Sequence, residues 1–162
     1  MLSDLVTDPI DLVNMLNLDA EQKPASLAAI DQFPMKVPRW FVSRIKRKDW
    51  NDPILAQLWP SQKEEFNTNN YVVDPLEEAR FNPVPGLLHK YTSRVLLTAA
   101  PHCAVHCRYC FRRHFDYNSN APSRKDWQAA FEHIRADSQI QEVLLSGGDP
   151  LGLSNKQIKF LI

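Results

Sequence analysis

Three cysteines lie within one stretch of eight residues, and the chain has no others. They are Cys103, Cys107 and Cys110, spaced as C-x3-C-x2-C. An odd number of closely spaced thiols is a poor disulfide framework, whereas reduced thiolates bind metal ions and iron–sulfur clusters. Three thiolates on one loop can each bind a different iron of a [4Fe–4S] cubane, which leaves the fourth iron open to a ligand. The spacing therefore predicts a cluster that binds a small molecule rather than a simple electron carrier.

A structural zinc site is the alternative for the same cysteines. It would be of the Cys3His type, with His102, His106 or His114 as the fourth ligand. Structural zinc usually ties two separated chain segments together through pairs of ligands. One short loop ties nothing together, so the spacing favours the cluster.

A second motif, Ser146-Gly147-Gly148-Asp149-Pro150, follows the apolar run 143–145. Two adjacent glycines let the backbone approach a ligand closely, and exposed carbonyls can accept hydrogen bonds from an ammonium group. Gly-Gly-Asp-Pro by itself is a common turn. Its place directly after a predicted strand, 37 residues beyond Cys110, makes it a candidate binding loop.

Both loops follow predicted strands. The aliphatic run at 94–98 predicts a buried strand, and a second apolar run at 143–145 predicts another strand. The pairs Ser123/Asp126 and Ser154/Gln157 predict capping boxes that begin two helices. Strands that alternate with helices indicate a parallel sheet, and ligands gather at the carboxyl ends of its strands. We therefore predict an α/β chain in which residues 91–162 form the first two β/α units of an incomplete barrel.

The first 90 residues are predicted to be a helical and extended lead-in region. Asp8-Pro9, Pro38 and Asp52-Pro53 are helix-start signals, and residues 61–90 are expected to be irregular. Trp40, Phe41 and Trp59 are interpreted as core contacts between helices, because basic residues are not arranged around them for nucleic-acid stacking.

Composition narrows the function classes. The chain has 162 residues, of which 44% are hydrophobic and 23% charged, and 19 basic residues balance 19 acidic ones. A formal net charge of zero gives no field to attract nucleic acid or an anionic membrane. No stretch reaches the roughly 18 apolar residues that a membrane span needs, and the acidic N-terminal segment does not resemble a secretory signal. We predict a cytoplasmic protein with neither a nucleic-acid nor a membrane partner.

The cysteine loop has one more telling feature, the aromatic Tyr109 just before its last cysteine. With that residue, C-x3-C-x2-C resembles the motif of the radical S-adenosylmethionine (SAM) superfamily. The resemblance implies a [4Fe–4S] cluster on the three cysteines that binds and cleaves SAM, with Tyr109 near the adenine. It also implies a partial TIM barrel in which Ser146, Gly147, Gly148 and Asp149 form the SAM-binding Gly-Gly motif.

Longer segments resemble the lysine 2,3-aminomutase family, and especially its bacterial branch that serves modification of elongation factor P. The matching stretches are Val37-Pro38-Arg39, Asn51-Asp52-Pro53-Ile54, Asp74-Pro75-Leu76, Pro83-Val84-Pro85-Gly86-Leu87-Leu88-His89-Lys90-Tyr91, Cys107-Arg108-Tyr109-Cys110-Phe111-Arg112-Arg113 and Ser146 to Leu151. The proline-rich lead-in to Lys90 is more particular to this family than the cysteine and Gly-Gly motifs are.

This second resemblance implies an isomerase that converts L-α-lysine to β-lysine with pyridoxal 5′-phosphate (PLP) as a further cofactor. By position, Lys90 and Tyr91 would contact the PLP phosphate and Arg112 would pair with the substrate carboxylate. The family commonly has arginine at the position of Lys90, so a point charge replaces a bidentate fork here. An electron donor such as flavodoxin or ferredoxin, elongation factor P and its lysyl ligase are the implied partners.

The same resemblance predicts what the chain lacks. In this family the lysine that binds PLP and the acidic residues that bind the distal amine lie beyond the position of Ile162. We therefore expect a truncated portion, inactive alone, with no catalytic residue besides those that hold cofactors and substrate. An aminomutase for another amino acid is the alternative within the superfamily.

Overall fold

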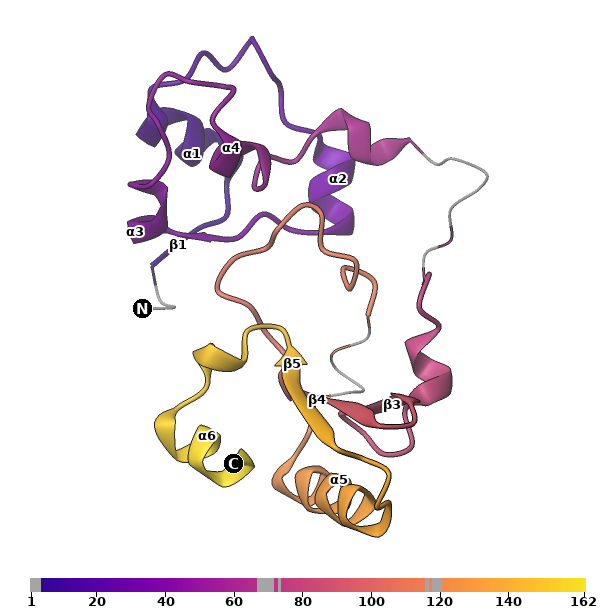
Figure 1. The fold of residues 1–162 in the computed structure, drawn as a ribbon. Helices are drawn as coiled ribbons and strands as arrows, with labels where there is room; N and C mark the ends of the chain where they lie inside the picture. The colour runs from indigo at the N-terminus through magenta and orange to yellow at the C-terminus, as the bar shows by residue number, and fades with distance from the viewer. Residues whose placement is uncertain (1–3, 67–71, 73, 116, 118–120) are drawn as a thin grey trace. The chain divides into compact units, whose positions relative to one another are not determined.

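The computed structural model describes residues 4–66, 72, 74–115, 117 and 121–162. These residues form two compact units, drawn in Figure 1. The first unit is Met1–Tyr71 with Ala104–Arg113, and the second is Val72–Cys103 with His114–Ile162. The predicted division into residues 1–90 and 91–162 stays a prediction. The two compact units have other boundaries. Residues 67–71 and 73 of the segment predicted to be irregular lie outside the described residues.

The first unit contains short helices and one small antiparallel strand pair. Its elements are β1 (Leu5–Val6), α1 (Pro9–Leu16), α2 (Leu27–Gln32), β2 (Val37–Pro38), α3 (Arg39–Val42), α4 (Pro53–Ala56) and the 3-10 helix η1 (Gln62–Glu65), and β1 pairs with β2. The predicted helix starts at Asp8 and Asp52 are confirmed. The Asp8 carboxylate accepts from the Ile10 N–H at 2.8 Å, and Asp52 accepts from the N–H of Ile54 at 2.8 Å. Each acid satisfies backbone donors that have no partner within the helix.

The core of the first unit is built from aliphatic side chains and two tryptophans. Its buried members are Val6, Leu12, Val13, Leu16, Met35, Val37, Val42, Ile45, Trp50, Leu55, Leu58 and Trp59. The rings of Trp50 and Trp59 meet edge to face, 4.8 Å apart. The core role predicted for Trp59 is confirmed, but the one for Trp40 is wrong, because half of that side chain is exposed. The helix α3 has only four residues, and such a short helix can place few side chains in the core.

The second unit is a three-stranded sheet with a crossover helix. Its elements are the 3-10 helix η2 (Glu78–Phe81), β3 (Leu87–Tyr91), β4 (Arg94–Ala100), α5 (Arg124–Ala136), β5 (Glu142–Gly147), the 3-10 helix η3 (Pro150–Gly152) and α6 (Asn155–Leu161). The strand order is β3-β4-β5, and β4 pairs with β5 in parallel, with Leu97 opposite Leu145. The predicted strands, both capping boxes and the parallel pairing are confirmed.

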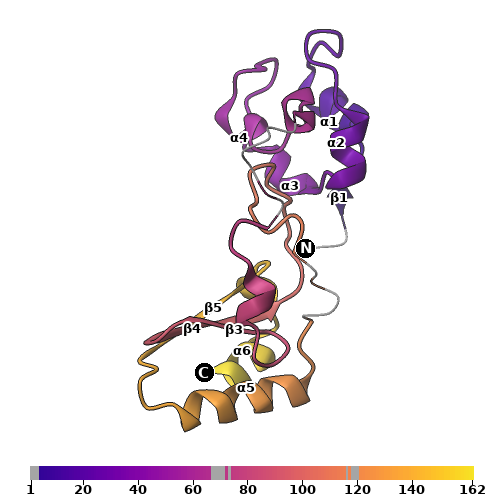
Figure 2. The same cartoon turned by 90° about the vertical axis from the view of Figure 1, so that its right-hand side faces the viewer.

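α5 covers one face of this sheet, as Figure 2 shows. Its Trp127 and Ala130 are buried against Leu87, Val95 and Leu97 of the sheet. The α6 side chain Phe160 lies beside Trp127, with ring centroids 5.8 Å apart. The strand–helix–strand order therefore builds a mixed α/β unit whose loops follow the carboxyl ends of β4 and β5.

Part of the prediction for residues 61–90 is wrong. Leu87–Tyr91 forms β3, which pairs antiparallel with β4 through a tight turn that sets Tyr91 opposite Arg94. Leu87 and Leu97 face each other and are fully buried, so burial of the two leucines stabilises a strand that the preceding prolines obscured. Within the described residues, none of the helices combines the length and apolar character that crossing a membrane requires.

Candidate iron–sulfur site

The cysteine loop begins where β4 ends. All three cysteines are reduced and partly buried. Cys103 belongs to the second compact unit, whereas Cys107 and Cys110 belong to the first. The Cys110 N–H donates to the Cys107 carbonyl at 3.0 Å, so these two thiols stand at the two ends of one tight turn.

Backbone hydrogen bonds hold that turn in the first unit. The N–H of His106 donates to the Lys36 carbonyl at 2.9 Å, and the N–H of Arg108 donates to the Gln57 carbonyl at 2.8 Å. The His106 ring stacks on Phe33 at 4.7 Å, and its Nδ1 lies 2.9 Å from the Pro34 carbonyl. Burial lowers the pKa of His106, which favours the neutral ring. Cys107 therefore has an anchored residue on either side.

The side chain of Arg108 makes the deepest contacts of the loop. Its Nε and Nη2 donate to the Glu64 carboxylate at 3.0 and 2.7 Å, and Nη2 also donates to the Ala29 carbonyl at 2.9 Å. Arg113 reaches the same carboxylate, with Nη2 2.9 Å from Oε2. Burial raises the pKa of Glu64, but the hydrogen bonds from Arg108, Ser61 and Arg113 outweigh it and leave the pKa below its usual value. Glu64 is therefore an ionised carboxylate between two guanidinium groups.

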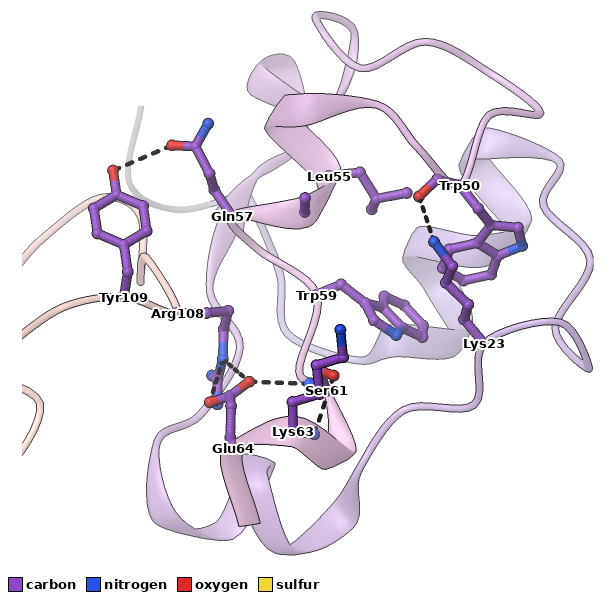
Figure 3. Close-up of a pocket in the computed structure, with 11 residues that line it drawn as sticks. Lys23, Trp50, Leu55, Gln57, Trp59, Ser61, Lys63, Glu64, Arg108 and Tyr109 are labelled. Atoms are coloured by element: carbon purple, nitrogen blue, oxygen red, sulfur yellow. Dashed lines mark hydrogen bonds and ion pairs between the residues drawn. The ribbon is translucent and has the colours of Figure 1, made fainter. Parts of the chain in front are cut away.

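Tyr109 lines a pocket of about 500 Å³ in the first unit (Figure 3). Its hydroxyl donates to Oε1 of Gln57 at 3.1 Å. A hydrogen bond with Cys107 raises the pKa of Tyr109, and the charges of Cys107 and Cys110 raise it further. The pocket is lined by Lys23, Trp50, Leu55, Ala56, Gln57, Trp59, Ser61, Lys63, Glu64, Arg108 and Tyr109. Tyr109 thus lies beside the Cys107 thiol, with most of its side chain exposed.

The Gly-Gly loop packs directly on the end of β4. The Gly148 N–H donates to the Ala100 carbonyl at 2.7 Å, and the Asp149 N–H donates to the His102 carbonyl at 2.9 Å. An ideal Cβ on Gly147 would lie 2.5 Å from the Ala100 oxygen, and one on Gly148 would overlap the His102 backbone. Gly147 also has φ +110°, a conformation that side chains rarely adopt. Both glycines are therefore required by the close approach of this loop to the start of the cysteine loop.

Two further groups in the Gly-Gly loop already have partners. The Gly147 carbonyl accepts from the Tyr117 hydroxyl at 3.0 Å, and the Asp149 carboxylate accepts from the Leu151 N–H at 3.0 Å. Asp149 caps η3 in this way, and Ser146 and Gly148 are partly buried beside it. Tyr117 is a residue that sequence reasoning missed, and nothing in its local sequence indicates that contact.

The residues expected to bind PLP and substrate contact other residues of the compact units to which they belong. Lys90 donates to the Leu76 carbonyl at 3.0 Å and lies 5.0 Å from the Phe81 ring centre, while the Tyr91 side chain is exposed. Arg112 is buried in the first unit, and its guanidinium lies 5.0 Å from the ring centre of Phe111. Arg94, considered as a structural ion-pair partner, pairs with Glu142 at 3.0 Å.

The donor set fits an iron–sulfur cluster, since a cubane takes one thiolate per iron. A single structural zinc ion would instead need a fourth ligand besides the three cysteines. Three reduced thiols on one loop are also the softest ligands that the chain offers.

Known proteins similar to this chain include an iron–sulfur domain family and several aminomutases. Residues 93–162 match the family model described as a 4Fe-4S single cluster domain. The whole chain is 44% identical to the L-lysine 2,3-aminomutase of Escherichia coli (strain K12), over 99% of the chain and 47% of that protein. It is 41% identical to the L-lysine 2,3-aminomutase of Haemophilus influenzae, over 100% of the chain and 48% of that protein. The whole chain is therefore similar to part of proteins named L-lysine 2,3-aminomutase.

The similarity extends to further relatives. The L-lysine 2,3-aminomutase of Methanococcus maripaludis is 38% identical, over 99% of the chain and 38% of that protein. The chain spans about half the length of the bacterial relatives named above. The similarity therefore covers both compact units and the cysteine loop between β4 and α5.

Proposed function

We propose that the protein containing this chain is a radical SAM, PLP-dependent L-lysine 2,3-aminomutase. The observation that carries the proposal is similarity over the whole chain to proteins named for that activity, together with a C-x3-C-x2-C loop at the carboxyl end of a parallel strand. The proposed fold of the intact protein is a partial TIM barrel that begins with β4, α5 and β5.

In this proposal the chain supplies ligands rather than acid–base groups. Cys103, Cys107 and Cys110 would hold the [4Fe–4S] cluster, which would leave one iron open for SAM. When bound, the cluster and SAM supply the radical chemistry, and PLP supplies a conjugated system that stabilises the migrating group. The chain's own residues would hold these groups and the substrate in the positions that the reaction needs.

The Gly-Gly loop is proposed to hold SAM. Gly147 and Gly148 place backbone directly against the end of β4, and Ser146 and Asp149 flank them. The Gly147 carbonyl has a second lone pair beyond the one that Tyr117 uses, so it can still accept from an ammonium group. Tyr109, beside the Cys107 thiol, is proposed to contact the adenine.

Lys90, Tyr91 and Arg112 are proposed to bind PLP and substrate. The ammonium of Lys90 and the exposed phenol of Tyr91 suit a phosphate. The Arg112 guanidinium suits a carboxylate, and its burial would strengthen that pairing. Each residue must turn toward its ligand from the contacts described above.

We further propose that the product serves modification of elongation factor P in the cytoplasm. The relatives from Escherichia coli and Haemophilus influenzae support a bacterial type of enzyme, and the early segments Val6-Thr7-Asp8-Pro9 and Leu16-Asn17-Leu18-Asp19 resemble that branch. A lysyl ligase would then consume β-lysine, and flavodoxin or ferredoxin would supply the electron.

The test is an anaerobic assay of the intact protein with SAM, PLP and a reductant. L-lysine and a panel of other L-amino acids are offered separately, and β-amino acids are detected by chromatography with mass spectrometry. Formation of β-lysine from L-lysine supports the proposal. A different β-amino acid as the main product would assign another substrate, and no turnover with any amino acid would contradict the aminomutase assignment.

A further inference from the structure

Two charged side chains with little exposure to solvent, Arg108 and Glu64, meet beside the cysteine turn. Arg108 follows Cys107 directly, and its side chain is 5% exposed, while that of Glu64 is 13% exposed. The guanidinium donates to both oxygens of the Glu64 carboxylate and to the carbonyls of Ala29 and Phe33. Four acceptor oxygens, from α2, the residue that follows it and η1, thus hold the side chain of Arg108, which is next to Cys107 in the sequence.

These contacts join segments that are far apart in the chain. Arg108 is 44 residues from Glu64 and 79 residues from Ala29. A planar guanidinium bound in two-pronged fashion to a carboxylate fixes orientation as well as distance. The turn from Cys107 to Cys110 is therefore ordered by the first unit's own residues.

Glu64 is itself held from the other side. Its Oε1 accepts from the Ser61 N–H at 2.9 Å as part of a capping box, so the carboxylate cannot follow Arg108 if the loop moves. Arg113, three residues after Cys110, lies 2.9 Å from the same carboxylate. One anion therefore balances two cations that flank the pair of thiols, and removing it leaves both cations buried without a counter-charge.

We infer that Glu64 is a positioning residue for the iron–sulfur site, which through Arg108 and Arg113 presets Cys107 and Cys110 before the cluster is inserted. This inference rests on the proposed function in one respect, that these cysteines are cluster ligands. Glu64 does not contact the thiols, so its effect passes through the two arginines.

The chain offers a matched control in the neighbouring Glu65. It lies in the same 3-10 helix, has the same side chain, and its carboxylate accepts from the Ser26 hydroxyl instead of from the cysteine loop. Glu64→Gln and Glu65→Gln therefore remove the same charge from adjacent positions. A difference between them reports on the pairing with Arg108 and Arg113 rather than on net charge.

The first measurement is amide hydrogen exchange of the intact protein without metal. In the wild type, the His106 and Arg108 amides should exchange at least about a hundredfold more slowly than in an unstructured peptide, because both donate to backbone carbonyls. Glu64→Gln should speed their exchange by about tenfold or more, and Glu65→Gln should leave it unchanged. Unprotected amides in the wild type would overturn the inference even if Glu64→Gln fails to fold.

The second measurement is the cluster itself after anaerobic reconstitution. Glu64→Gln should bind less iron, and the cluster that forms should have a more positive midpoint potential, because two guanidinium charges lose their partner. Glu65→Gln should match the wild type in both. Equal iron content and equal potential in the two variants would overturn the inference. A wild type that binds no iron would instead overturn the proposed function, whatever the amides show.

Discussion

Gly148 offers the sharpest test of how the Gly-Gly loop is built. Its N–H donates to the Ala100 carbonyl at 2.7 Å, and a Cβ at this position would overlap the backbone of His102. Backbone cannot rotate aside as a long side chain can, so Gly148→Ala must push the loop away from the end of β4. Gly152 is the matched control, because nothing lies within 4 Å of the Cβ that alanine would add there.

The free-energy cost of Gly148→Ala comes from the contacts that the substitution weakens. Moving the loop weakens the hydrogen bonds from Gly148 to Ala100 and from Asp149 to His102, each worth about 0.5–1.5 kcal/mol. Overpacking that shifts backbone typically costs about 1–3 kcal/mol and overlaps with that loss. We expect Gly148→Ala to lower the free energy of unfolding by about 2–4 kcal/mol. Gly152→Ala should leave it unchanged or raise it by roughly 0.4–1 kcal/mol.

The assay is urea unfolding of the intact metal-free protein, followed by circular dichroism, with a thermal melt as a second probe. A loss of 2–4 kcal/mol corresponds to a Tm lower by roughly 4–16 °C for a protein of about 150–250 residues. A Gly148→Ala protein within about 0.5 kcal/mol of the wild type would refute the close approach. Equal losses for Gly148→Ala and Gly152→Ala would refute it as well, since only one of them meets backbone.

Three other predictions concern separate parts of the chain. Arg112→Lys in the intact enzyme should lower kcat/KM for lysine by about ten- to a hundredfold, because the charge remains but the planar fork is lost; unchanged lysine kinetics with lost iron would make Arg112 structural. Burial raises the pKa of Asp52, but three backbone N–H donors outweigh it and hold the pKa below its usual value. The stability that Asp52 contributes is therefore present above about pH 4 and lost as the pH falls through the lowered pKa, so an Asp52→Asn protein should lose less stability in acid melts than the wild type; identical acid profiles would contradict this. Val143, Leu144 and Leu145 of β5 are 36–42% exposed, so residues 1–162 alone should self-associate and Leu144→Lys should reduce it in gel filtration; a monodisperse wild-type monomer would contradict it.

The elements that could be predicted depend on residues that are close together in the sequence. Ser123 with Asp126 and Ser154 with Gln157 form capping boxes that begin α5 and α6, and each box needs only four neighbouring residues. The aliphatic runs at 94–98 and 143–145 became β4 and β5, although only β4 is buried along most of its length. The position of both candidate loops after parallel strands followed from these elements.

Contacts between distant residues were not predictable from the sequence. β3 exists because Leu87 and Leu97 bury each other across a hairpin, and the prolines before it suggested irregular chain instead. The pair Glu64–Arg108 joins residues 44 apart, and neither has a neighbour that indicates the other. A buried ion pair of this kind depends on the tertiary fold, so only the structure could place it beside the cysteine turn.

Metal content in matched variants tests the central claim most directly. The intact protein, reconstituted anaerobically with iron and sulfide, should hold about four irons and show broad iron–sulfur absorbance. Cys103→Ala, Cys107→Ala and Cys110→Ala should each lose that absorbance, whereas His106→Ala should keep it, and reduced wild type should cleave SAM to 5′-deoxyadenosine. Full iron and sulfide in the Cys107→Ala protein, or bound zinc that disappears in the His106→Ala protein, would contradict the account.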